Sequence, residues 1–243
     1  MKTTIYAASL LLAGSVSAHG GVISYTIDGK TYAGLSTSPP PGGAANTIQR
    51  SWAKLDPIRD PNSPNLACNS PGAPAKLSAT ATAGATITAK WNNWPHNSGP
   101  LLVWMTECKG DCSTFSPAGA DWFKIYQEGL LSGTIGHGKW ATRQMIENNE
   151  SLSVKIPESL KPGNYLIRHE TINLARAPAE FYPECAQLKV VGSGSASPSE
   201  QFRAKLPGAY HKSDSAFAHA YSDAAVSSNT KYVIPGPPVW TGN

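Results

Sequence analysis

Short apolar or alternating runs recur along the chain between stretches rich in Gly, Pro and Asn. Runs of this kind, bounded by turn residues, predict β-strands. No segment of ten or more residues has the periodicity of an amphipathic helix, although 119–127 is compatible with an initial turn of helix. The predicted strands are 22–27, 85–91, 101–106, 123–127, 152–156, 165–170 and 186–191.

The number and spacing of these strands predict an all-β fold, an immunoglobulin-like or fibronectin-like antiparallel β-sandwich with long decorated loops and little helix. The excursion 36–64 is rich in proline and shows little periodicity, so we expect a packed surface segment. Residues 192–199 have the composition of a flexible linker. Only 44 residues follow, and they are rich in aromatics, so we expect a C-terminal segment that wraps over the same sandwich.

Composition narrows the class of protein. Charged residues make up 15% of the 243 residues, while 22 glycines and 20 prolines favour turn-rich β structure over a helix bundle, a coiled coil or a charged disordered chain. The formal net charge of +4 is small and scattered, with no basic run. This balance indicates neither nucleic acid nor an anionic membrane as a partner.

The N-terminus has the pattern of a secretory leader. Lys2 precedes the apolar run 5–16, and Val16 and Ala18 supply the small residues that a signal peptidase requires. A run of twelve residues is too short to span a bilayer. We therefore predict that residues 1–18 are a signal peptide and that the exported chain is a single domain, 19–243, beginning at His19.

Export places the four cysteines in an oxidising compartment, where an even set permits three pairings. Cys108 with Cys112 is the easiest pair to close, which leaves Cys68 with Cys185. Asn149 begins the sequon Asn-Glu-Ser and is the candidate glycosylation site, compatible with a surface loop.

A histidine at the first position of the exported chain can chelate a metal ion through its free amine and its imidazole Nδ1. A second imidazole would give three nitrogens in a plane, an arrangement that suits Cu(II). The candidate is His96, which lies in a Pro/Gly-framed turn beside Trp94 and before the predicted strand 101–106. The alternatives are a chance histidine at position 19 and a hydrogen-bonded turn histidine at position 96.

His96 also begins a longer pattern of His, two residues, Gly-Pro, three residues, an aromatic and an aliphatic, carried by 96–105. Residues 181–185 and 231–237 add two further matches. On these residues the chain resembles the fungal lytic polysaccharide monooxygenases of auxiliary activity family nine, once classed as glycoside hydrolases. A further pattern, aliphatic-Pro followed by Gly-x-Tyr-aliphatic-x-Arg-x-Glu, is met by Ile156, Pro157, Gly163, Tyr165, Leu166, Arg168 and Glu170.

The resemblance covers nearly the whole of 19–243 and is weakest in 36–64. It implies a copper ion held by the His19 amine, His19 Nδ1 and His96 Nε2, with the Tyr182 hydroxyl approaching axially. It also implies an external electron donor, O₂ or H₂O₂ as co-substrate, and oxidative cleavage of a β-1,4-linked polysaccharide, cellulose or a related β-glucan or hemicellulose, at C1 or C4.

The resemblance further implies a flat face around the metal, with aromatic side chains that stack on sugar rings. Tyr210 resembles the stacking tyrosine of the family's C-terminal loop, and Tyr25 and Tyr32 are the candidates on the N-terminal side. No separate carbohydrate-binding module is present, so we expect a secreted monomer that binds the polysaccharide through its catalytic face.

Two positions depart from the family's pattern. Ala175 stands where the family has His, Asn or Gln, and Glu180 stands where it usually has Gln. Groups around a metal's ligands commonly tune it by about 10-fold to 100-fold. Arg176 could compensate by donating toward Glu180. The alternative function is a copper-binding or polysaccharide-binding protein with weak or no oxygenase activity.

A glycoside hydrolase is a third possibility, since it needs two carboxylates flanking the scissile bond. Glu180 and Glu184 are the nearest close pair, but Pro183 intervenes and no other acidic cluster is evident. His169 is next to Arg168 on a predicted strand, so its side chain should lie on the opposite face and have a structural role.

Overall fold

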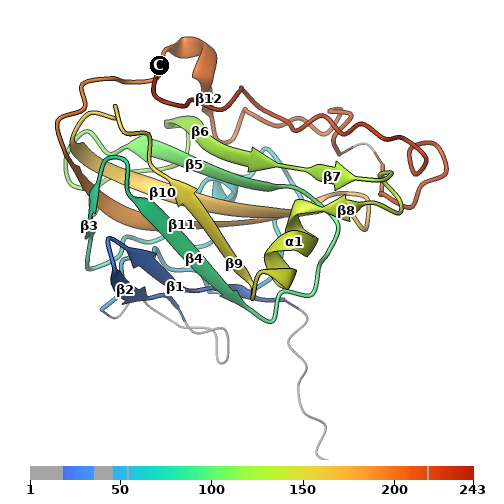
Figure 1. Ribbon diagram of the computed structural model, residues 1–243, viewed down its shortest axis with the longest axis horizontal. Coiled ribbons are helices and arrows are strands. Elements are labelled where there is room, and N and C mark those ends of the chain that lie inside the picture. The colour runs from blue at the N-terminus through green and yellow to red at the C-terminus, as the bar shows by residue number, and fades with distance from the viewer. Residues whose placement is uncertain (1–18, 36–45, 54, 218) are drawn as a thin grey trace, which may run out of the picture.

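The computed structural model describes residues 19–35, 46–53, 55–217 and 219–243, whose main strands form two facing β-sheets (Figure 1). The smaller sheet has the order β2 (Lys30–Ala33), β1 (Gly21–Ile27), β4 (Thr86–Asn92), β9 (Ser151–Lys155). The larger sheet has the order β12 (Arg203–Lys205), β6 (Asp121–Glu128), β5 (Leu101–Glu107), β10 (Gly163–Asn173), β11 (Glu180–Val191), β3 (Ala79–Thr82). The remaining elements are the hairpin β7 (Leu130–Ser132) and β8 (Lys139–Trp140), helix α1 (Ala141–Glu147), and the short 3-10 helices η1 (Pro64–Leu66) and η2 (Glu200–Phe202).

The predicted all-β sandwich is confirmed, and each of the seven predicted strands is present as β1, β4, β5, β6, β9, β10 or β11. Neighbouring strands pair antiparallel, with one exception to the prediction: β3 pairs with β11 in parallel. The predicted signal peptide 1–18, and residues 36–45 and 54 of the proline-rich excursion, lie outside the described residues.

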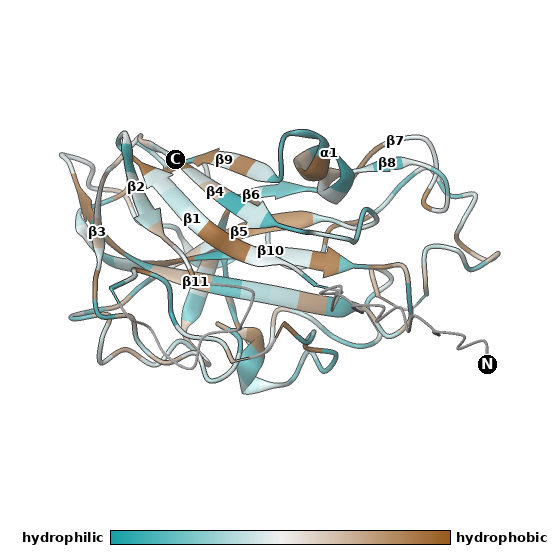
Figure 2. Cartoon of the chain, turned by 90° about the horizontal axis from the view of Figure 1, so that it is seen from below, coloured by the Kyte–Doolittle hydropathy of each residue, from teal (hydrophilic) through white to brown (hydrophobic). Residues whose placement is uncertain are grey.

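The inner faces of the two sheets bury alternate side chains against each other. Along β4, Ile87, Ala89 and Trp91 are buried while the residues between them are partly exposed, which is the alternation that the sequence shows. Hydrophobic stretches are visible on β1, β9 and β10 (Figure 2). Central strand β5 is buried on both faces, because loops and the C-terminal segment cover the outer face of the larger sheet.

Helical structure in the sandwich is limited to short segments. The segment 119–127 does not begin with a turn of helix: a hydrogen-bonded turn from Pro117 to Ala120 leads directly into β6. Helix α1 was not predicted because it spans only seven residues, with Ala141, Thr142 and Met145 as its buried face. No helix within the described ranges is long and apolar enough to cross a membrane.

The C-terminal segment packs on the sandwich, as expected. Trp240 N donates to Lys124 O of β6 at 2.8 Å, and the Trp240 side chain is buried. The described part of 36–64 is also packed: Ile58 pairs with Phe181 of β11. Both expected disulfides are present, one joining Cys68 to Cys185 and one joining Cys108 to Cys112.

Candidate metal centre

His19 lies at the edge of the smaller sheet, directly before β1. Its neighbour Gly20 runs so close to β4 that a Cβ on Gly20 would lie 1.9 Å from Asn92 O. Only glycine permits this approach, which brings the backbone of residue 19 to the end of the sandwich where the loop from β4 to β5 begins.

The loop 93–100 carries His96 and is fixed at several points. Trp94 N donates to Glu150 Oε1 at 2.9 Å. Gly99 has φ 155° and lies so close to β10 that a Cβ would be 1.7 Å from Ile172 O. The Thr142 hydroxyl of α1 donates to Gly99 O at 3.1 Å. The predicted Pro/Gly frame thus holds the backbone after His96 between β10 and α1.

The three predicted ligand residues come together. The ring centroids of His19 and His96 are 5.4 Å apart, those of His19 and Tyr182 are 5.5 Å apart, and those of His96 and Tyr182 are 5.7 Å apart. The Tyr182 hydroxyl lies 3.2 Å from His96 Nε2. Trp94 packs edge-on against both Tyr182 and His96, with centroids 4.9 Å and 5.5 Å away.

The pKa values of this cluster leave it ready to bind a cation. Burial, with the neighbouring His19, lowers the pKa of His96, so its imidazole is neutral at neutral pH. Burial and the Glu180 carboxylate raise the pKa of Tyr182 well above its usual value, so the phenol keeps its proton. Burial alone would raise the pKa of Glu180, but hydrogen bonds from Asn173, Arg59 and Tyr182 outweigh it and hold that pKa below the usual value.

Glu180 is the centre of a hydrogen-bond network beside Tyr182. Arg59 Nη2 donates to Glu180 Oε1 at 2.5 Å, and Asn173 Nδ2 donates to Oε2 at 2.8 Å. The Tyr182 hydroxyl donates to the same Oε2 at 3.1 Å. The Ala175 backbone N–H donates to Asn173 Oδ1 at 3.0 Å, so the residue that breaks the family's pattern still helps to orient the network.

The predicted Arg176–Glu180 contact is wrong. Arg176 is exposed and makes no ion pair among the residues that the structure describes, whereas Arg59 contacts the carboxylate. Arg59 belongs to the proline-rich excursion, 121 positions from Glu180, and no motif surrounds it. Neither Arg59 nor Asn173 was identified from the sequence. Local spacing carries no signal for the Arg59 contact, whereas Asn173 is only seven positions from Glu180 and pairs with it across β10 and β11.

The donor set fits a transition-metal ion. One ligand atom each from His19, His96 and Glu180 lie within 4.8 Å of one another. Neutral imidazoles suit copper, zinc, iron and nickel, and a phenol and a carboxylate are next to them. The residues present are therefore compatible with the copper that the sequence predicts.

The predicted sugar-stacking aromatics do not lie on an open face near this cluster. Tyr25 and Tyr210 are fully buried, so neither can stack on a sugar. The Tyr210 hydroxyl instead donates to Glu170 Oε2 at 2.6 Å. Tyr32 is half-buried on β2 and pairs with Tyr25, which is about 20 Å along β1 from residue 19 at the usual rise per residue. The assignments of Tyr25 and Tyr210 are therefore wrong, whereas that of Tyr32 stays a prediction.

Two other residues of the sequence analysis occupy the sandwich interior. His169 is buried on the opposite face of β10 from Arg168 and Glu170, as predicted, and burial lowers the pKa of its imidazole to about 3. Glu184 is also buried between the sheets, where desolvation raises the pKa of its carboxyl to about 8. Glu180 and Glu184 therefore do not flank a cleft as a hydrolase pair would.

Asn149 is exposed in the turn between α1 and β9 and has φ 55°. An exposed turn is accessible to modification, as the sequence analysis expected. The glycosylation itself stays a prediction.

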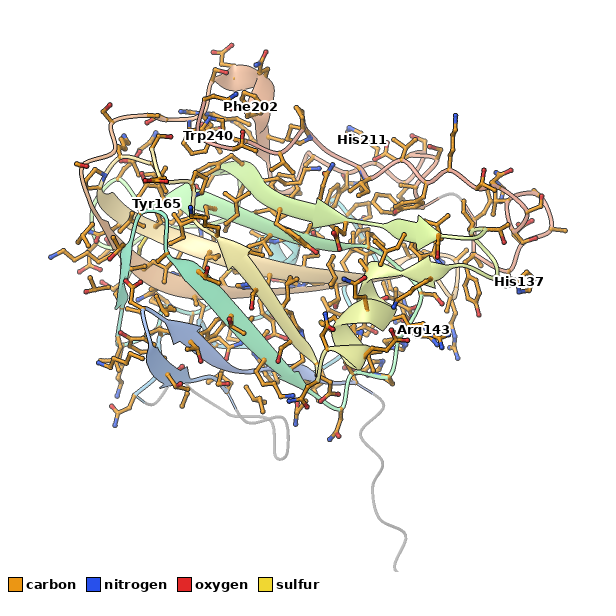
Figure 3. All side chains as sticks on the ribbon, viewed as in Figure 1. His137, Arg143, Tyr165, Phe202, His211 and Trp240 are labelled. Atoms are coloured by element: carbon orange, nitrogen blue, oxygen red, sulfur yellow. A yellow bond between two sulfur atoms is a disulfide. The ribbon has the colours of Figure 1, made fainter. Side chains whose placement is uncertain are left out.

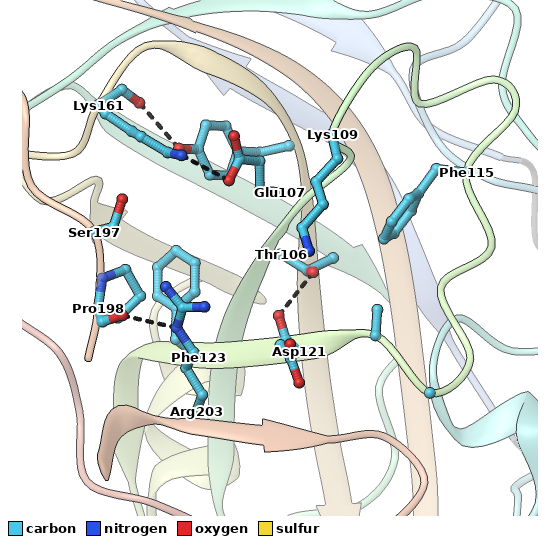
Figure 4. Close-up of a pocket in the computed structure, with 13 residues that line it drawn as sticks. Thr106, Glu107, Lys109, Phe115, Asp121, Phe123, Lys161, Ser197, Pro198 and Arg203 are labelled. Atoms are coloured by element: carbon cyan, nitrogen blue, oxygen red, sulfur yellow. Dashed lines mark hydrogen bonds and ion pairs between the residues drawn. The ribbon is translucent and has the colours of Figure 1, made fainter. Parts of the chain in front are cut away.

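A cavity of about 210 Å³ lies at the other end of the sandwich (Figure 4). Figure 3 shows Tyr165, which lines it, at the opposite end of the molecule from Arg143 of α1. None of the predicted site residues lines this cavity. His19 and His96 are partly exposed, so the cluster around His19 reaches the surface of the molecule.

Comparisons with known proteins show the family of the chain. A model of Auxiliary Activity family 9 (formerly GH61) matches residues 19–232. Lytic polysaccharide monooxygenase B of Heterobasidion irregulare (strain TC 32-1) is 45% identical over 244 residues, which cover 98% of each chain. Lytic polysaccharide monooxygenase D of Thermothelomyces thermophilus is 43% identical over 240 residues, 96% of this chain and 92% of that relative.

Solved structures give the same result. The crystal structure of HiLPMO9B superposes with a TM-score of 0.86 at 44% identity and covers 92% of this chain and 100% of its own. A cellulose-active polysaccharide monooxygenase from M. thermophila gives a TM-score of 0.84 at 42% identity, with coverage of 93% and 100%. From its motifs, its fold and these relatives, the chain belongs to Auxiliary Activity family 9, the lytic polysaccharide monooxygenases.

Proposed function

We propose that this protein is a secreted, copper-dependent monooxygenase that cleaves a β-1,4-linked polysaccharide by oxidation at C1, C4 or both. The observation that carries the proposal is the convergence of His19, His96 and Glu180 ligand atoms within 4.8 Å, in a chain of this family. The Tyr182 hydroxyl lies beside them. Copper bound there would supply the redox chemistry that oxidises a sugar C–H bond.

His19 would supply two of the nitrogens once residues 1–18 are removed. Cleavage after Ala18 converts the backbone nitrogen of His19 into a free amine, next to its own imidazole. With His96 this makes three nitrogen donors, a set that suits Cu(II). The amine has an ordinary pKa near ~7.7 and must lose its proton to bind, so copper affinity should fall as the pH drops below neutral.

The surrounding side chains orient the proposed ligands and hold the proton of the Tyr182 hydroxyl. Tyr182 keeps its phenolic proton, and its hydroxyl would be a further ligand beside His96. Glu180, held by Arg59 and Asn173, accepts from the Tyr182 hydroxyl and fixes its position. Trp94 packs against His96 and Tyr182 and keeps water from the inner side of the cluster.

The substrate we propose is cellulose, because the M. thermophila relative carries the words cellulose-active in its name. Related β-glucans and hemicelluloses such as xylan and xyloglucan are the competing substrates. The protein would act outside the cell as a monomer, with a small reductant or a secreted redox enzyme as electron donor. We expect no nucleic-acid or membrane partner.

The experiment is to purify the exported protein, sequence its N-terminus and titrate it with Cu(II). We expect His19 first, one copper per chain, and oxidised oligosaccharides that need both copper and reductant when cellulose is supplied. His211→Ala, a histidine outside the cluster, is the matched control for His96→Ala. A different first residue, or products with ordinary reducing ends formed without reductant, would contradict the proposal.

The alternative is a copper-binding or polysaccharide-binding member with weak or no oxygenase activity. Ala175 and Glu180 favour it, because the family's usual side chains at these positions are missing beside the metal ligands. Tight copper binding without oxidised products from cellulose, xylan or xyloglucan would select this alternative.

A further inference from the structure

The two sheets are joined by one buried polar contact close to the proposed metal centre. The Glu184 side chain, on β11 of the larger sheet, accepts a hydrogen bond at Oε2 from the Val22 backbone N–H of β1 in the smaller sheet, at 2.9 Å. Both residues are buried. The contact therefore links the sheets through the interior of the sandwich, where solvent does not compete.

The contact is possible because β1 departs from regular pairing at this point. The pairing of β1 with β4 shifts register between Val22 and Ser24, which marks a β-bulge or irregularity. Irregularities of this kind redirect backbone groups away from the ladder. The Val22 N–H accordingly points across the interface to Glu184 and not to a neighbouring strand.

A second partner holds the Glu184 carboxyl in place. Gln49 Nε2 donates to the same Oε2 at 2.5 Å, and Gln49 Oε1 accepts from Leu35 N at 2.6 Å. Gln49 is fully buried, and its backbone pairs with Ala186 of β11. The Glu184 Oε2 atom that accepts from the Val22 N–H is thus also fixed by Gln49.

The position of this contact links the proposed ligands. Val22 is three residues after His19, and Glu184 is two residues after Tyr182 on the same face of β11. At the usual rise per residue, the contact therefore lies within about 10 Å of both His19 and Tyr182. His19 and Tyr182 come from different sheets, yet their rings are 5.5 Å apart. Any change in the spacing of the sheets here would change that separation.

We infer that Glu184 is a positioning residue that sets the distance between His19 and Tyr182 through its hydrogen bond to the Val22 N–H. It does not touch the metal; it fixes the strand that carries the N-terminal histidine. The inference rests on the proposed function, because it takes His19 and Tyr182 to be metal ligands.

The test compares Glu184→Leu with Glu184→Gln, which keeps an acceptor oxygen for Val22 and Gln49. Gln187→Leu is the matched control: Gln187 is buried on the same strand but bonds to Ala75 and Leu77, not to β1. The measurements are hydrogen exchange at the Val22 amide of the metal-free protein, the Cu(II) dissociation constant, the Cu(II) EPR spectrum and the thermal midpoint.

We expect Glu184→Leu to speed exchange at Val22 and to weaken copper binding by roughly 10-fold to 100-fold, the usual effect of losing an outer support of a metal ligand, with an altered EPR spectrum. Glu184→Gln should keep the wild-type values. Gln187→Leu should lower the thermal midpoint but keep the copper affinity and the spectrum.

Faster exchange at Val22 with unchanged affinity and spectrum in Glu184→Leu would overturn the inference. So would equal copper effects in Gln187→Leu. Should the leucine variant not fold, Glu184→Asp, whose shorter side chain withdraws the acceptor, gives the same comparison. Failure of the wild-type protein to bind copper would instead refute the proposed function, so the two failures are distinguishable.

Discussion

At the scale of single residues, Arg59 is the charged side chain that contacts the candidate metal centre from the proline-rich excursion. It is the charged partner of Glu180, at 2.5 Å, and both Ala175 and Glu180 depart from the family's pattern beside it. The Arg59 side chain is 53% exposed, whereas that of Glu180 is 5% exposed, so the ion pair closes the cluster at the surface. We therefore expect the pair to affect turnover.

Replacing Arg59 by Met should lower the oxidative rate by roughly 10-fold to 100-fold, because Glu180 and the Tyr182 hydroxyl that it fixes lose their outer support. The copper dissociation constant should change less. Glu180→Gln, which removes the charge that Arg59 pairs with, should also change the oxidative rate more than the copper dissociation constant. Product formation and calorimetric copper titration would measure the two quantities.

Arg176→Met is the matched control, since it removes the same charge from an exposed residue without an ion pair among the described part of the chain. Equal rate losses in Arg59→Met and Arg176→Met would point to a general effect of positive charge on the substrate face, and the role given to the Arg59–Glu180 pair would be wrong.

His169 makes the stability of the fold depend on pH. Burial lowers the pKa of His169 from 6.5 to about 3, and neither ring nitrogen has a hydrogen-bond partner among the described residues. Below pH 6.5 the unfolded chain binds a proton that the folded chain does not. Stability is therefore complete above pH 6.5 and falls as the pH drops toward 3, by about 1.4 kcal/mol per pH unit from this residue.

Urea unfolding of the metal-free protein between pH 4 and pH 6 would measure this slope. His169→Leu should reduce the slope by about 1.4 kcal/mol per pH unit, whereas Gln187→Leu should lower stability without changing the slope. An unchanged slope in His169→Leu would show that His169 is protonated in the folded state.

At the scale of elements, the strands that were predicted are the longer ones, which span five to twelve residues each. β2, β3, β7, β8 and β12 span two to four residues each, and so short a run carries no recognisable periodicity. Their pairing depends on partners far away in the sequence. The Arg59 contact was not predicted for the same reason. His19 and His96 were predicted because the residues next to them form recognisable motifs.

β11 shows how tertiary context extends a strand beyond its sequence signal. The prediction began this strand at 186, but it starts at Glu180 and contains Pro183. Phe181 N donates to Ile58 O, and Cys185 O accepts from Arg50 N, so the backbone groups of these odd-numbered residues point away from β10. Pro183 is also odd-numbered, so the ladder with β10 does not need the N–H that proline lacks.

Tyr210 attaches the C-terminal segment to the larger sheet. The Tyr210 hydroxyl donates to Glu170 Oε2 at 2.6 Å, and Glu170 is in turn ion-paired to Arg168. Tyr210→Phe leaves a buried carboxylate oxygen short of a donor and should lower the free energy of unfolding by about 1–3 kcal/mol. Urea unfolding would measure it.

Tyr232→Phe is the control, since the buried Tyr232 hydroxyl has no partner among the described residues and its removal should be nearly neutral. A Tyr210→Phe protein of unchanged stability would show that the hydroxyl does not stabilise the attachment of the C-terminal segment.

At the scale of the whole molecule, the sandwich brings together the proposed ligands from distant parts of the chain. His19 precedes the first strand, His96 lies in the loop between β4 and β5, and Tyr182 lies near the start of β11. No local motif spans such separations, so the site depends on the packing of the two sheets. Anything that holds β11 in place should therefore also hold the proposed metal centre.

The Cys68–Cys185 disulfide is such a restraint, since it ties β11 to the loop after η1 across 117 residues, whereas Cys108 and Cys112 are four apart. In the chain-entropy model the long loop contributes roughly 5 kcal/mol to stability and the short one roughly 2 kcal/mol. Replacing both members of the long pair by Ala should therefore lower the free energy of unfolding more than replacing the short pair. It should also weaken copper binding, because Cys185 is three residues from Tyr182 on the same strand. Calorimetric unfolding and copper titration of the two double variants would measure both effects. A long-pair variant that loses stability yet keeps its copper affinity would show that β11 holds its position near Tyr182 without the covalent tie.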